Sequence, residues 1–226
     1  MQKLLKCAVV SALVIMSTPC FADDAVLDAN IASLRESWGH IKYEITDKDA
    51  QQAEIAKLEV NAEKTAAAFP DRAEPKIWEA IILATDAGIT KSISGLPKVK
   101  KAKSLLEEAL KEDETALHGS AYTTLGSLYY QVPGWPISFG DKDKASQNLK
   151  AALSINPDGR DPNYFYGDFL LKKGEYNQAV TVLQHALAAP PRVGYEKIDA
   201  GRKEEINQAI AEATKHLGTQ AANRFN

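Results

Sequence analysis

One four-residue pattern occurs twice in the chain, and the two copies are separated by 34 positions. Each copy has alanine, leucine and alanine at helical spacing, followed by a proline: Ala145, Leu149, Ala152 and Pro157, then Ala179, Leu183, Ala186 and Pro191. A period of this length is typical of repeats built from two helices. Stacked helix pairs bury a continuous core and leave a curved binding face. The spacing therefore predicts an all-α, right-handed solenoid of about three to four helix pairs.

The second copy has the clearest helix start and stop signals. Asp161 is expected to cap the first helix, with Pro162 at the first helical position, where a missing N–H has no cost. Gly174 is expected to end that helix in the left-handed conformation. A second helix is predicted over 175–188, stopped by Pro190-Pro191.

Two glycines are predicted to let paired helices approach closely. Gly167 precedes Ala179 by 12 positions, whereas Gly126 precedes Ala145 by 19 positions. Seven extra residues therefore lie between the helices of the earlier pair. They fall in a loop at 131–140, which is too rich in proline and glycine to be helical. Asp141 is expected to cap the second helix of this pair, which ends at Asn156-Pro157.

Weaker repeat signals extend in both directions and suggest how the chain is organised. Residues 71–191 are interpreted as repeats, with a helix from Pro75 to Ala87 followed by a second inserted loop at 88–97. Residues 23–70 are expected to form a degenerate helix pair that is broken near Thr46-Asp47 and has Trp38 in its core. Residues 192–226 are expected to hold a capping helix, about 199–217, and a tail.

The first 22 residues have the pattern of an export signal. Lys3 and Lys6 give a basic start, an apolar stretch follows, and Cys20-Phe21-Ala22 provides small residues for cleavage after Ala22. The apolar stretch is too short for a membrane anchor, which needs about 20 residues. Pro19 before Cys20 disfavours a lipoprotein signal. We therefore expect a periplasmic protein without stable membrane insertion.

Charge and cysteine content exclude several classes of function. The net charge is −3 and becomes more negative when Lys3 and Lys6 are removed, which disfavours binding to nucleic acid. The lysine cluster from Lys98 to Lys103 is interpreted as a solvated helix face. Cleavage removes both cysteines, so neither a disulfide nor a thiol nucleophile is expected.

No residue pattern predicts catalysis, a cofactor or a metal site. The four histidines lie far apart in the sequence, and none has a second ligand at metal spacing: His40, His118, His185 and His216. Neither a phosphate-binding glycine loop nor a Gly-x-Ser-x-Gly elbow is present. We therefore predict a protein that is not an enzyme and has no cofactor.

These features resemble a known repeat family. Residues 119–191 resemble tetratricopeptide repeats, and about 75–217 resemble periplasmic tetratricopeptide proteins of proteobacteria. Two segments resemble the T component of tripartite ATP-independent periplasmic (TRAP) transporters: Tyr129 to Lys142, with Trp135-Pro136, and Ala189 to Arg192. The resemblance implies a binding role without chemistry of its own.

The same resemblance implies which residues would contact a partner. Tetratricopeptide repeats bind through the inner face of the first helix of each pair, and the inserted loop adds apolar side chains. The candidate binding residues are Thr123, Ser127, Tyr130, Trp135, Phe139, Tyr164, Asp168 and Lys172. Tyr164 and Asp168 depart from the pattern of repeats that clamp a carboxylate. Such a polar face with tyrosines suits an extended peptide or another protein.

Packing offers an alternative role for the aromatic residues. Tyr130 and Tyr164 could pack only against neighbouring helices, and the loop side chains could cover Tyr129. At the level of function, the leading hypothesis is an adaptor or scaffold for a protein or peptide. The alternatives are a ligand-handling accessory protein of a TRAP-type transporter and an oligomeric structural protein.

Overall fold

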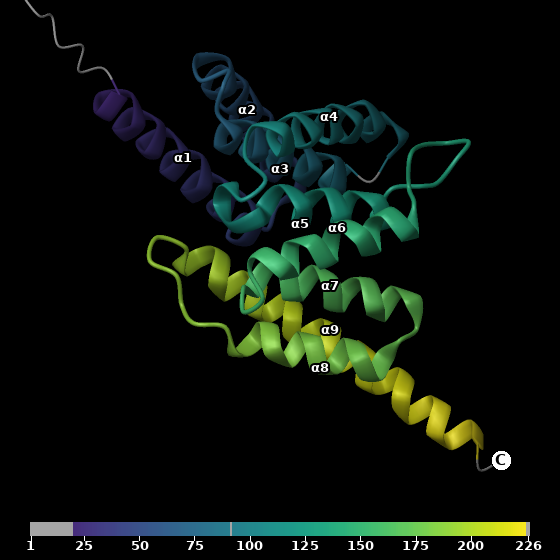
Figure 1. Ribbon diagram of the computed structural model, residues 1–226. Helices are drawn as coiled ribbons and strands as arrows, with labels where there is room; N and C mark the ends of the chain where they lie inside the picture. Colours follow the sequence, from purple (N-terminus) through teal and green to yellow (C-terminus); the bar gives the residue numbers. More distant parts are fainter. Residues whose placement is uncertain (1–19, 91, 225–226) are drawn as a thin grey trace, which may run out of the picture.

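The Ala-, Leu-, Glu- and Lys-rich segments form helices, as their composition favours. The computed structural model describes residues 20–90 and 92–224, so the predicted signal lies largely outside the described residues (Figure 1). The described residues form nine α-helices and one 3₁₀ turn: α1 (Cys20–Tyr43), α2 (Lys48–Ala68), α3 (Ala73–Thr90), η1 (Ile93–Gly95), α4 (Leu96–Glu112), α5 (Ala116–Gln131), α6 (Lys142–Ile155), α7 (Arg160–Lys173), α8 (Tyr176–Ala188) and α9 (Glu196–Arg224).

Consecutive helices pack as antiparallel pairs, and each pair packs on the next. The pairs are α1 with α2, α3 with α4, α5 with α6, and α7 with α8, and α9 covers α8. Helices α3, α5 and α7 also contact one another along the stack. The predicted all-α solenoid of helix pairs is confirmed.

The two glycines predicted to lie at close helix contacts do so. A Cβ atom on Gly126 would lie 2.7 Å from Cγ of Leu149, and one on Gly167 would lie 2.6 Å from Cγ of Leu183. Both leucines belong to the repeated pattern and are fully buried. The side chain of the second helix therefore occupies the space that glycine leaves in the first.

The structure confirms two of the predicted helix-capping residues and contradicts a third. The Asp141 carboxylate caps α6 by accepting hydrogen bonds from two backbone N–H groups, and Gly174 ends α7 in the left-handed conformation. The prediction that Asp161 caps α7 is wrong, because α7 begins at Arg160 after Gly159. The Asp161 carboxylate instead pairs with arginine side chains from other segments.

The loop predicted at 88–97 is much shorter in the structure. Helix α3 continues to Thr90, and α4 already begins at Leu96, with Pro97 in its first turn. A Cβ atom on Gly88 would meet nothing within 4 Å, so this glycine marks no turn or close contact. Proline in the first turn removes only an N–H that has no partner within the helix.

Two lysines of the predicted solvated face of α4 form ion pairs with neighbouring helices. Lys98 pairs with Glu59 of α2 and with buried Asp86 of α3. Lys101 lies 2.8 Å from Glu79, a buried carboxylate of α3. Lys101 remains exposed as predicted, but both lysines also join α4 to its neighbours, because carboxylates of α2 and α3 face them.

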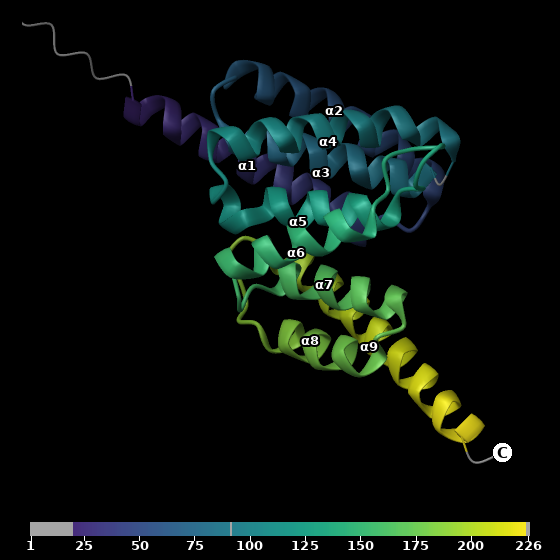
Figure 2. The same ribbon diagram turned by 45° about the vertical axis from the view of Figure 1, so that its right-hand side comes forward.

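Helix α9 extends beyond the range predicted for a capping helix and contacts α1 at the other end of the chain. A Cβ atom on Gly201 of α9 would lie 2.1 Å from Cδ1 of Tyr43, so the two helices cross in direct contact there. Ile198 belongs to the same buried cluster as Trp38, which confirms Trp38 as a core residue. The start of α9 therefore contacts the end of α1, and the rest of α9 runs along α8 and away from α1 (Figures 1 and 2).

We expect Gly167→Ala to lower the free energy of unfolding by about 1–3 kcal/mol, because its Cβ would overlap Leu183. Gly218→Ala is the matched control, since Gly218 lies in α9 with open space around it. There, alanine should stabilise the helix by about 0.5–1 kcal/mol. Urea unfolding of both variants measures the difference, and equal effects would contradict the close contact.

Candidate functional site

A cavity of about 690 Å³ lies inside the closed stack. Its walls come from the inner helices α1, α3, α5, α7 and α9, with the start of α2 and the loops that precede α7 and α9. Among the described residues, the outer helices α4, α6 and α8 contribute nothing to the lining. The cavity therefore occupies the concave face of the repeat stack.

One wall of the cavity is apolar and aromatic. Trp38 and Trp78 meet edge to face with their ring centroids 6.0 Å apart, and both are buried. Nε1 of Trp38 donates a hydrogen bond to Oγ1 of Thr85, which fixes the orientation of that ring. The remaining apolar lining comes from α3, α5, α7 and the α9 region: Ile81, Ile89, Leu117, Leu128, Phe165, Tyr195 and Ile198.

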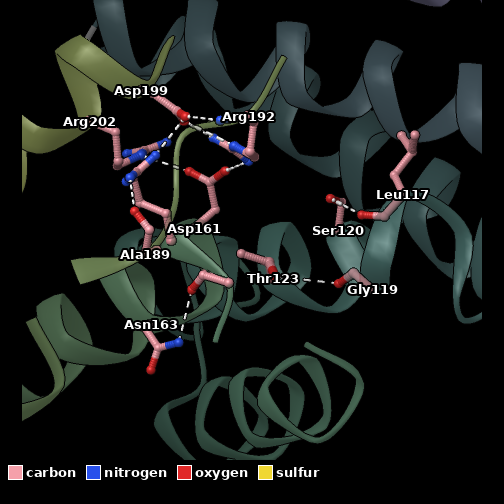
Figure 3. Close-up of polar contacts among 12 residues, drawn as sticks. Leu117, Gly119, Ser120, Thr123, Asp161, Asn163, Ala189, Arg192, Asp199 and Arg202 are labelled. Carbon is pink, nitrogen blue, oxygen red and sulfur yellow. Dashed lines mark hydrogen bonds and ion pairs between the residues drawn. The ribbon is translucent and has the colours of Figure 1, made fainter. Parts of the chain in front are cut away.

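Another part of the lining carries a connected set of charges from α7, α9 and the loop between α8 and α9 (Figure 3). Arg192 binds two carboxylates, with Nη1 located 2.7 Å from Oδ2 of Asp161 and Nη2 located 2.5 Å from Oδ1 of Asp199. Nη1 of Arg160 lies 2.6 Å from Oδ2 of Asp199. These pairs connect the start of α7 to the start of α9.

The same set of charges continues to α1. Nε of Arg202 lies 2.8 Å from Oδ1 of Asp161, and its Nη1 lies 2.5 Å from Oε2 of Glu205. Oε1 of Glu205 lies 3.0 Å from Nζ of Lys42, and the hydroxyl of Tyr43 also donates to this carboxylate. The charged groups therefore bridge the contact between the first and last helices.

Burial and neighbouring charges shift the pKa values of these groups. Burial alone would raise the pKa of Asp161, but attraction by Arg202 and Arg192 outweighs it and lowers the pKa to about 2. The pKa values of Asp199 and Glu205 are also lowered by their basic partners against the effect of burial. The pKa of Lys42 is lowered by burial and by the nearby Arg202.

A left-handed backbone turn faces this set of charges across the cavity. Leu117, His118 and Gly119 all have positive φ, at 48°, 57° and 77°. The left-handed conformation costs roughly 1–2 kcal/mol for a residue other than glycine. The hydroxyl of Ser120 donates to the carbonyl of Leu117 at 2.7 Å and stabilises the turn. Such strain is typical of binding sites, and Leu117 and His118 both line the cavity.

The structure places only two of the predicted binding residues in the cavity. Thr123 and Ser127 lie on the inner face of α5 and line it. The Oγ1 atom of buried Thr123 donates to the carbonyl of Gly119 at 3.3 Å. These two residues therefore lie on the side of α5 that faces the cavity, and their contact with a partner stays a prediction.

Four other predicted residues lie outside the cavity lining. The Tyr130 hydroxyl donates to Asp168 at 2.6 Å, and Lys172 binds the same carboxylate at 2.7 Å. Burial and the adjacent Asp168 raise the pKa of Tyr130. Tyr164 packs against Phe165 and under the guanidinium of Arg202. These side chains join α5 to α7 and α7 to α9.

The two predicted aromatic residues of the inserted loop have different surroundings. Phe139 packs edge to face on Tyr129, with ring centroids 5.7 Å apart. Trp135 is 90% exposed, and Ile137 is 60% exposed. The packing alternative thus holds for Phe139, whereas Trp135 faces solvent.

Sequence reasoning missed most of the charged wall. Arg192 is part of a segment that resembles the TRAP transporter component, but it is not among the candidate binding residues. The candidates also do not include Arg160, Asp199, Arg202 or Glu205. These residues lie in separate segments, and no repeat spacing relates them. The start of α7, where arginine and aspartate are adjacent, was the available local signal.

The described residues provide no group of three or more His, Cys, Asp or Glu side chains that could hold a metal ion. Within the described part of the chain, no helix is both long enough and apolar enough to span a membrane.

A family model described as tetratricopeptide repeat matches residues 137–193, which include α6, α7 and α8. The chain therefore contains a tetratricopeptide repeat, in agreement with the 34-residue period. Such repeats typically mediate protein–protein interaction, which supports a role as an adaptor or scaffold. The curated proteins include no match to the chain.

We expect the stability of the protein to fall as pH drops from about 5 to about 2. The folded-state pKa values of Asp161, Asp199 and Glu205 are depressed, so their contribution is complete above the unfolded values and disappears on protonation.

Asp161→Asn should lower the free energy of unfolding at pH 7 by about 3 kcal/mol, because it leaves arginines without their partner. The substitution should also reduce the decrease in the free energy of unfolding between pH 5 and pH 3. Urea unfolding at pH 7, 5 and 3 measures both effects, with Asp71→Asn at an exposed position as the control. An unchanged pH dependence would contradict the role of Asp161.

Proposed function

We propose that this chain is a non-catalytic periplasmic adaptor that docks a protein partner. The observation that carries the proposal is a firmly anchored surface loop, 132–140, with an exposed tryptophan at its tip. The tetratricopeptide match supports the same role. Export rests on the amino-terminal sequence pattern and is part of the proposal.

Backbone hydrogen bonds and one partly buried ring, that of Phe139, anchor the loop. The N–H of Gly140 donates to the carbonyl of Pro133 at 2.9 Å, and the N–H of Asp141 donates to the backbone carbonyl of Tyr129 at 2.8 Å. Together with the contact between Phe139 and Tyr129, these bonds fix both ends. A loop that is already ordered loses little entropy on binding.

The exposed side chains give the loop the character of a protein-binding surface. Trp135 is 90% exposed, although tryptophan is among the residues that contribute most at protein interfaces. Ile137 extends the apolar surface beside it. A partner with an apolar pocket would bury both side chains.

Trp135→Ala should leave the melting temperature nearly unchanged, because the ring contributes little to the core. It should remove a partner captured from a periplasmic extract by the immobilised wild-type protein. Val193→Ala is the control, since Val193 is 96% exposed on a different loop. Capture that survives Trp135→Ala would contradict the docking role, and capture of its own chain alone would favour an oligomeric structural protein.

Export can be tested separately by the intact mass of the protein recovered from the periplasm. We expect a chain that begins at Asp23, because cleavage after Ala22 fits the signal pattern. A chain that keeps Cys20 with a lipid adduct, or one that stays in the cytoplasm, would contradict this.

The cavity favours a second candidate function, a ligand-handling accessory protein such as a component of a TRAP-type transporter. Its volume of about 690 Å³ falls within the 300–1,000 Å³ typical of small-molecule sites. The contact between α1 and α9 narrows the concave face, on which a wider solenoid would accommodate an extended peptide.

A further inference from the structure

We propose that α2 is a pH-sensitive element of the fold, because Glu59 of α2 and Asp86 of α3 share one lysine and one proton. Mildly acidic solution then fastens α2 to the body of the protein, and alkaline solution loosens it. The inference goes beyond both candidate functions and depends on neither of them. Three features support it: the charge balance between α2, α3 and α4, the burial of the two carboxylates, and the small apolar face of α2.

Lys98 of α4 binds one carboxylate from each of two other helices. Its Nζ atom lies 2.8 Å from both carboxylate oxygens of Glu59 and also binds the carboxylate of Asp86. The hydroxyl of Thr90 donates to Oδ1 of Asp86 at 3.3 Å, and the side chain of Gln52 donates to Thr90. With both carboxylates ionised, this cluster has one more negative charge than positive charge.

A second cluster, one turn further along α2, repeats the arrangement. Nζ of Lys101 lies 2.9 Å from Oε1 of Glu63 on α2 and 2.8 Å from Oε1 of Glu79 on α3. Two lysines of α4 therefore face four carboxylates of α2 and α3. The Glu63 side chain is 65% exposed, so water solvates its charge. The excess negative charge is therefore more costly in the first cluster than in the second.

Burial makes it unfavourable for both carboxylates of the first cluster to be ionised. The side chain of Asp86 is 3% exposed, and that of Glu59 is 18% exposed. Burial raises the pKa of Glu59, Lys98 opposes this effect, and the nearby Asp86 adds to it, with a net increase. Burial alone would lower the pKa of Lys98, but its two carboxylate partners raise it, so the lysine stays charged. One proton shared by the two carboxylates removes their repulsion.

The raised pKa of Glu59 determines the direction of the pH effect. The additional hold on α2 is complete below the unfolded pKa of 4.5 and is lost as the pH rises through the higher folded-state pKa. The lowered pKa of Asp161 has the opposite consequence at the contact between α1 and α9. Alkaline solution should therefore loosen α2, whereas strongly acidic solution should loosen the contact between α1 and α9.

The apolar face of α2 is small, so the ion clusters matter for its attachment. Two of its four buried residues are alanines, which bury little apolar surface: Ile55, Leu58, Ala62 and Ala66. Three of the four belong to the same buried cluster as Trp38 and Trp78. The start of α2 also lines the cavity through Lys48 and Gln51. Loosening of α2 would therefore uncover the tryptophans and change the lining of the cavity.

Hydrogen exchange of the whole protein measures the hold on α2. We expect the protection of α2 amides, corrected for the intrinsic pH dependence of exchange, to fall several-fold between pH 5 and pH 8. Protection of α6 should stay unchanged. Glu59→Gln keeps the shape of the protonated carboxyl group and should hold α2 equally well at both pH values.

Glu54→Gln is the matched control, because it makes the same charge change at an exposed position of α2, where Glu54 pairs with Lys57. This variant should keep the pH dependence of the wild-type protein. Equal protection of wild-type α2 at pH 5 and pH 8, or a pH dependence that survives Glu59→Gln, would overturn the proposal.

Carbon-13 NMR titration of the glutamate carboxyl groups tests the shared proton in the wild-type protein. We expect the carboxyl group of Glu59 to titrate at a higher pH than that of Glu54. Asp86→Asn should lower the titration midpoint of Glu59, because Lys98 then attracts its charge without opposition. A midpoint for Glu59 at or below that of Glu54 would overturn the proposal, and this comparison decides if Asp86→Asn is unstable.

Acrylamide quenching of fluorescence tests whether loosening of α2 reaches the cavity. The chain has three tryptophans, and Trp135→Phe removes the exposed one, which leaves Trp38 and Trp78. We expect stronger quenching at pH 8 than at pH 5 in this background, and equal quenching when Glu59→Gln is added. Quenching that does not depend on pH would contradict the coupling between α2 and the cavity.

Discussion

The contact between α1 and α9 determines how the rest of the molecule can function. A row of helix pairs would by itself present an open concave groove. Here Gly201 lets α9 approach Tyr43, and Ile198 enters the same buried cluster as Trp38. The first and last helices therefore meet, and the groove becomes a cavity with a defined volume.

The charges around that contact position the helices more than they stabilise them. A buried ion pair often contributes little net stability, because desolvation opposes the attraction, yet breaking it leaves an uncompensated charge. The connected set of charges, from Arg160 to Lys42, joins α7, α9 and α1 in one arrangement. Several of the same groups line the cavity, so the contact between the first and last helices and the charges of the site have a common origin.

Helix α5 connects the cavity with the exposed loop. Its inner face presents Thr123, Ser127 and Leu128 to the cavity, and Tyr129, the next residue, anchors the loop through Phe139. The two candidate functions thus use adjacent surfaces of one rigid helix. A partner docked at Trp135 would lie at one end of the helix that also lines the ligand site.

The sequence by itself determined the helix pairs and their local contacts. The repeat period placed Gly126 against Leu149 and Gly167 against Leu183, and local signals identified Asp141 and Gly174 as helix caps. These features depend on residues close in sequence or related by the period. The positions on the inner face of α5 could be predicted for the same reason.

Only the tertiary structure decided how the ends meet and what the cavity contains. The partners of Asp161 lie at positions 192 and 202, so no local rule could show that this residue binds arginines instead of capping a helix. Lys98 and Lys101 of α4 likewise pair with carboxylates on α2 and α3. Long-range charge pairing and helix closure depend on which surfaces the whole stack brings together, and repeat spacing carries no information about that.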